Sequence, residues 1–156
     1  MLMTAKEAVL ELLKREKEVG DAAAQGVDAI RREWLLALAE LMAQIRQWLK
    51  AAEQEKLLQV EEYTASLREE RLGNYDAPAL KIVTPRGFAL NVKPKARFVV
   101  GGMGRVDLDA MPKLRILVRK DRTTWQVAKQ TGEHGFWSFA DLDENSFWQA
   151  LNELMM

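Results

Sequence analysis

In the first half of the chain, apolar side chains recur every three or four positions, which is the spacing of one face of an α-helix. Thr4, followed three residues later by Glu7, is typical of an N-terminal capping box. Gly20 is a residue type that commonly ends a helix. The pattern therefore predicts a first helix over residues 4–19 and, after an Ala-rich joint, a long helix over residues 28–72.

The long predicted helix contains no Gly and no Pro, and its apolar side chains form a seam like that of a coiled coil. A helix of that length extends about 65 Å, which is more than a compact domain of this size buries across its own width. It therefore either bends near residue 54, where the seam is interrupted, or associates with a partner. We predict self-association, with a dimer favoured, through Ile30, Trp34, Leu41, Ile45 and Trp48.

From residue 79 onward the apolar period changes to two, which is typical of strands. The connections are too short for crossover helices, so the pattern predicts an antiparallel sheet of about five to seven strands. Asp143 is a suitable cap for a C-terminal helix over residues 143–155. The sequence thus predicts an α+β protein. A long helical hairpin or coiled-coil-like arm over residues 1–75 precedes a small antiparallel β-sheet capped by a C-terminal helix over residues 76–156.

Composition narrows the possible classes of protein. The chain has 156 residues, 48% of them hydrophobic, which argues against wholesale disorder. It contains no Cys, which excludes disulfides, thiolate metal sites and Cys nucleophiles. The longest apolar run, from Trp34 to Ala39, is too short to cross a bilayer, and no secretory leader is visible at the N-terminus. We therefore expect a cytoplasmic protein without membrane association.

The formal net charge of zero hides an uneven distribution of charged residues. Residues 1–75 carry 11 Lys and Arg against 14 Asp and Glu, a balance of −3. Residues 76–130 carry 12 against 4, a balance of +8, and residues 131–156 carry none against 5, a balance of −5. If the apolar side chains of the strands face the core, cations gather on the opposite face of the sheet. We predict that this face binds an acidic partner through Lys93, Lys95, Arg97, Arg105, Arg115 and Arg119.

Catalytic motifs are missing from the sequence. The Gly-rich segment 101–104 precedes a strand and lacks the Lys of a phosphate-binding loop, so it predicts a tight turn. Asp107 and Asp109 share one face of a strand, but ion pairs with neighbouring Arg side chains explain them better than a divalent metal does. His134, the only histidine, is expected in an exposed loop. We predict no metal, no cofactor and no enzymatic activity, with a metal-dependent hydrolase as a remote alternative.

Together these features predict a non-enzymatic interaction or assembly module. It self-associates or docks through its helical arm and presents a basic β-sheet face to an acidic protein partner. The alternative is a nucleic-acid-binding accessory protein that uses the same face. Few aromatic residues are interleaved among the cations, which argues against a stacking platform for single strands.

Overall fold

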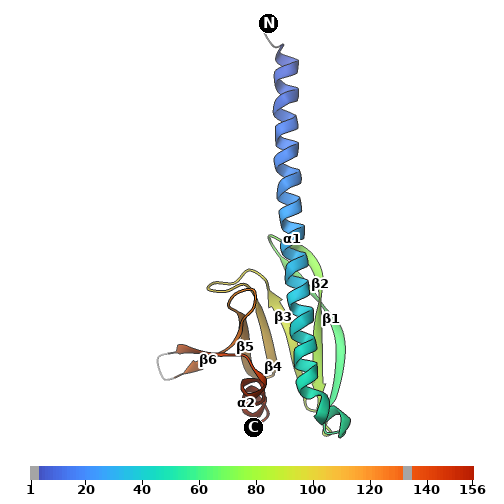
Figure 1. Cartoon of the computed structure of the whole chain (residues 1–156), viewed down its shortest axis with the longest axis vertical. Helices are drawn as coiled ribbons and strands as arrows, with labels where there is room; N and C mark the ends of the chain where they lie inside the picture. The colour runs from blue at the N-terminus through green and yellow to red at the C-terminus, as the bar shows by residue number, and fades with distance from the viewer. Residues whose placement is uncertain (1–3, 132–134) are drawn as a thin grey trace.

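The structure is a computed structural model that describes residues 4–131 and 135–156, so His134 lies outside the described residues (Figure 1). A long helix, α1, precedes seven strands and a short C-terminal helix, α2. Their bounds are α1 (Ala5–Gln54), β1 (Gln59–Glu69), β2 (Gly73–Val83), β3 (Ala89–Ala96), β4 (Arg105–Ala110), β5 (Lys113–Arg119), β6 (Trp125–Thr131), β7 (Phe136–Asp141) and α2 (Glu144–Met155). The strands form one sheet in chain order, and each neighbouring pair is antiparallel. The predicted α+β class is confirmed.

The helical half contains one helix where the sequence predicted two. The capping box at Thr4 and Glu7 is present as predicted, but the helix continues through Gly20 and the Ala-rich joint to Gln54. Gly20 and Gly26 each cost about 1 kcal/mol relative to Ala in a helix. That cost does not end the helix, because the flanking residues, rich in Ala, Glu and Lys, are strong helix formers.

The predicted helix over residues 28–72 is wrong in its second part, because Gln59–Glu69 forms strand β1. Helix α1 ends at Gln54, close to the position where the apolar seam was predicted to be interrupted. Just beyond it, Lys56 has a φ of 59°, the left-handed conformation that commonly ends a helix and that Gly usually adopts. Eleven residues of β1 pair with β2 in continuous register, from Gln59 opposite Val83 to Glu69 opposite Gly73. This pairing overrides the helical propensity of the Glu, Leu and Arg side chains in β1.

The β1–β2 hairpin extends past its neighbour in the sheet. Strand β2 pairs with β3 only from Leu80 to Val83, so its first seven residues pair with β1 alone. Two contacts hold this free part against α1: Arg31 Nη1 donates to the Leu72 carbonyl at 2.8 Å, and Trp34 Nε1 donates to the Tyr75 hydroxyl at 3.1 Å. The hairpin therefore lies alongside α1 (Figure 1).

The C-terminal half of α1 and helix α2 share one hydrophobic core with the sheet. Asp143 caps α2 by accepting a hydrogen bond from the Ser146 amide at 2.8 Å, as predicted. The ring of Trp48 lies 5.4 Å from that of Phe147, which joins the two helices. The buried side chains of α1 are Trp34, Ala37, Leu38, Leu41, Met42, Ile45 and Leu49.

Candidate interaction surfaces

The structure places most of the predicted self-association seam inside this chain's own core. Trp34 and Ile45 are 0% exposed and Leu41 is 4% exposed, all packed beneath the sheet. Ile30 and Trp48 are only partly buried and lie at the margin of that core. Self-association stays a prediction, and of the five seam residues only Ile30 and Trp48 keep appreciable exposed surface for it.

The N-terminal half of α1 projects from the body as an exposed arm, here residues 5–26 (Figure 1). At 1.5 Å per residue the arm extends about 33 Å beyond the sheet. Val9, Leu12 and Val19 are 52%, 60% and 70% exposed. The sequence predicted a separate helix over residues 4–19 and gave no sign that these side chains stay exposed; among the described residues, none from the sheet or α2 covers them.

A second exposed feature is a groove between α1 and the start of α2, which we call the α1–α2 groove. It has a volume of about 670 Å³ and an apolar lining that includes Leu41 and Trp48 from α1. Trp125 and Leu142 line its opposite side. Such a floor is suited to aliphatic side chains rather than to a highly polar ligand.

The rim of the α1–α2 groove is mainly acidic. Glu40 lies on α1, Asp143 and Glu144 lie at the start of α2, and Arg122 is the cation among the lining residues. Such a rim favours an occupant that carries Lys or Arg beside apolar side chains.

The six cations of the predicted basic face do not share one face. Arg115 Nη2 lies 2.7 Å from Glu153 on α2, and Arg119 Nη1 lies 2.7 Å from Glu33 on α1, so both point to the helical side of the sheet. Arg105 Nε donates to Asp107 at 2.7 Å. Lys93 and Arg105 lie on the side of the sheet away from the helices, while Lys95 and Arg97 flank the irregular end of β3. Whether any of the six cations binds a partner stays a prediction.

Several arginines gather where the arm leaves the body, around Glu33. The hydrogen bond from Arg119 holds the pKa of Glu33 below its ordinary value, and Arg97 and Arg122 act in the same direction. Burial lowers the pKa of Arg97. Glu33 Oε2, Arg97 Nε and Arg119 Nε have no hydrogen-bond partner among the described residues. Because 86 positions separate Glu33 from Arg119, local sequence patterns give no sign of this pair.

The edge strand β7 exposes two aromatic side chains. Trp137 is 50% exposed and Phe139 is 55% exposed. Phe139 is opposite Ala128, which is opposite Ile116, so by strand alternation this row lies on the side of the sheet away from the helices. The same row ends at Lys93, so aromatic and cationic side chains share this side.

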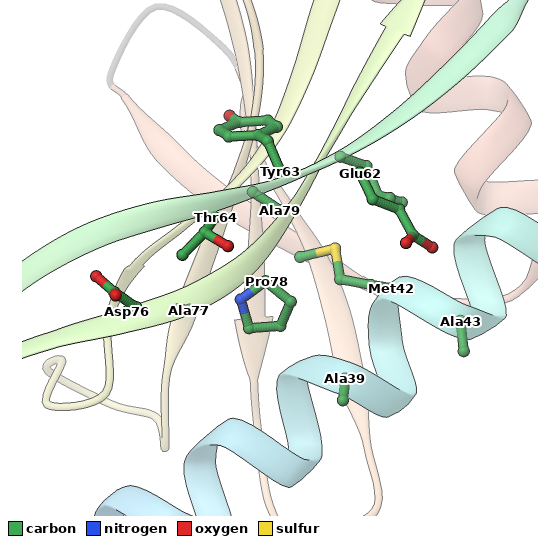
Figure 2. Close-up of a pocket in the computed structure, with 11 residues that line it drawn as sticks. Ala39, Met42, Ala43, Glu62, Tyr63, Thr64, Asp76, Ala77, Pro78 and Ala79 are labelled. Carbon is green, nitrogen blue, oxygen red and sulfur yellow. The ribbon is translucent and has the colours of Figure 1, made fainter.

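A further cleft, of about 570 Å³, lies between α1 and the β1–β2 hairpin (Figure 2). Met42 points across it toward Pro78 (Figure 2). Its two carboxylates are engaged: Glu62 accepts from Arg46 at 2.5 Å, and Asp76 accepts from Ser66 at 3.1 Å. This cleft therefore holds no free acid–base pair.

The described residues contain no group of three or more His, Asp or Glu side chains arranged to hold a metal ion. Asp107 is 2% exposed and accepts two hydrogen bonds from Arg105, and Asp109 accepts one from the Met111 amide at 3.1 Å. Their contacts are therefore those of structural carboxylates.

Comparison of the chain with protein-family models, with curated proteins and with solved structures finds no match. Among the described residues, neither helix has a segment long and apolar enough to cross a membrane.

Proposed function

We propose that the protein is a non-enzymatic assembly module that self-associates through the arm of α1. The body would then present cationic side chains to an acidic partner. Linking two bodies raises the effective concentration of their binding surfaces without any new contact between body and partner.

The exposed apolar stripe of the arm is the observation that carries this proposal. Val9, Leu12 and Val19 follow three-and-four spacing on one side of a helix and stay exposed, uncovered by any described part of the body. An isolated helix of this length is only marginally stable in water, since most helical stability in proteins comes from packing an apolar face. A partner helix on the stripe would supply that packing.

Leu12→Glu is expected to weaken self-association at least about 100-fold, because each dimer would bury two unpaired carboxylates in place of two leucines. Light scattering coupled to size exclusion, over a range from about 1 to 100 µM, measures the change. Circular dichroism checks that the body remains folded.

Leu10→Glu is the matched control, because Leu10 is also exposed (46%) but lies on the other side of the helix from the stripe. It should leave the dimer intact. A wild-type chain that is monomeric at tens of micromolar, or equal loss in both variants, contradicts the proposal.

Nucleic-acid binding is a second candidate function, favoured by the exposed aromatics of β7 on the same side of the sheet as Lys93. Bases stack on exposed aromatic rings while nearby cations contact the phosphates. Trp137 and Phe139 would supply the stacking surface that the sequence pattern did not indicate.

If this second function holds, Phe139→Ala combined with Lys93→Glu should weaken binding of a single-stranded oligonucleotide about 30-fold at 50 mM salt. Arg115→Glu is the comparison, since Arg115 already bonds Glu153 and faces the helices. Fluorescence anisotropy measures both variants. Binding that is undetectable or insensitive to salt in the wild-type protein rejects this candidate.

A further inference from the structure

We propose that the partner of the arm is a second copy of this chain, bound antiparallel, so that each arm lies along the α1–α2 groove of the other copy. The inference rests on the proposed self-association and adds its geometry. It joins two features that are separate in a single chain: the exposed apolar stripe of the arm and the apolar groove between α1 and α2.

The stripe and the groove lie on the same side of α1. Starting from Val9, Leu12 and Val19, steps of three and four residues lead along one side of the helix to Leu41 and Trp48, which line the groove. Because α1 is unbroken between them, the arm and the groove face the same direction. In a dimer whose twofold axis is perpendicular to α1, each arm can therefore bind the groove of the other copy at the same time.

The antiparallel register follows from the positions of these side chains along the helix. A twofold axis near Gly26 places Leu12 level with the partner's Leu41, and it places Val9 level with the partner's Gln44. The two bodies then lie at opposite ends of the helix pair and do not collide, since each occupies the length opposite the other's arm. Both grooves are filled by equivalent contacts.

Charges along the pair are complementary in this register. Arg15 comes level with the partner's Leu38, which is two residues, or about 3 Å, from Glu40 on the rim of the partner's groove, and Arg15 and Glu40 lie on the same flank of the stripe. In an antiparallel pair of helices, the same flank of each helix faces the other copy. Arg15 of one copy therefore lies near Glu40 of the other.

Small residues mark the point where the helices would cross. An added Cβ at Gly20 or Gly26 meets nothing within 4 Å in the single chain, so intramolecular packing does not require glycine at either position. Each glycine nevertheless costs about 1 kcal/mol of helix stability relative to Ala. A second helix backbone approaching closely near Gly26 accounts for the small residues there.

Cross-linking tests the orientation directly, because the chain has no cysteine of its own. The double variant Glu11→Cys/Gln44→Cys, treated with a short bismaleimide, should form covalent dimers, since position 11 of one copy lies beside position 44 of the other. The two positions are about 50 Å apart within one α1, so the reagent cannot join them inside a single chain. The single variants should not cross-link, because positions 11 of the two copies lie about 46 Å apart.

A charge exchange supplies a readout that needs no cross-linker. Arg15→Glu and Glu40→Lys should each weaken the dimer about tenfold, and combining them should restore it, because the pair is re-formed with reversed signs. Equal and additive losses contradict the register.

The outcomes separate this inference from the proposed function. Covalent dimers from Glu11→Cys alone show a parallel pair, which overturns the antiparallel inference and keeps self-association. If light scattering shows a dimer but no variant forms a cross-link, the antiparallel inference is likewise overturned and self-association is kept. A monomeric wild-type chain removes both proposals, and cross-linking confined to the double variant supports the antiparallel pair.

Discussion

Trp34→Ala is expected to lower the free energy of unfolding by about 4 kcal/mol, because it removes a large and fully buried side chain from the core. The Trp34 ring is 0% exposed, lies 6.1 Å from the ring of Trp125, and donates a hydrogen bond to Tyr75. Its removal leaves a cavity between α1 and the sheet and takes away the donor to the Tyr75 hydroxyl. Urea denaturation followed by far-ultraviolet circular dichroism measures the loss.

Leu36→Ala is the matched control on the same helix, since Leu36 is 60% exposed. It should cost less than about 1 kcal/mol. If the two variants lose similar stability, α1 is not anchored to the sheet through Trp34 as described.

Gly104→Ala is expected to cost about 3 kcal/mol through a clash with the same indole. A Cβ at this position would lie 2.2 Å from Trp34 Cζ3 and 2.4 Å from Cη2, and the φ of +151° is itself unfavourable for alanine. The ring has no room to move, because it is enclosed by α1, β2 and β6. The same denaturation experiment gives the change in unfolding free energy.

Gly101→Ala separates backbone strain from the clash. Gly101 has a φ of +78°, but an added Cβ there meets nothing within 4 Å, so strain alone costs about 1 kcal/mol. In the double variant Trp34→Ala/Gly104→Ala the clash disappears, and the combined loss should fall below the sum of the single losses. A strictly additive result would show that Gly104 and Trp34 do not meet.

The parts of the fold that the sequence predicted well are those specified locally. The capping box at Thr4 lies within four residues, and the cap of α2 at Asp143 likewise depends only on its own turn. The antiparallel arrangement follows from short connections. Such features depend on neighbours in the chain, so a sequence pattern contains the information for them.

The parts that the sequence predicted wrongly are those decided by distant contacts. Strand β1 has helix-favouring side chains, and its state is set by pairing with β2. The two helices predicted over residues 4–19 and 28–72 are instead one helix as far as Gln54, because two glycines cost less than breaking it.

The surfaces were harder to predict from the sequence than the elements. Alternation put six cations on one face, yet Arg115 and Arg119 bond carboxylates on α2 and α1 and point to the helical side. The helical period likewise identified an apolar seam without showing which part of it the sheet would cover. Only the packed structure distinguishes the buried Trp34 and Ile45 from the exposed Leu12.

Because α1 is unbroken, it sets the distance between the tip of the arm and the sheet as well as the direction in which the apolar stripe faces. Because no loop interrupts the helix between Ala5 and Gln54, the residue count alone sets how far the first turn stands from the sheet. Inserting seven residues into the arm would move its tip outward by about 10.5 Å and nearly preserve its direction, whereas inserting one would turn the tip by about 100°. Natural variation in the length of this segment should therefore come in whole heptads, as in a molecular ruler.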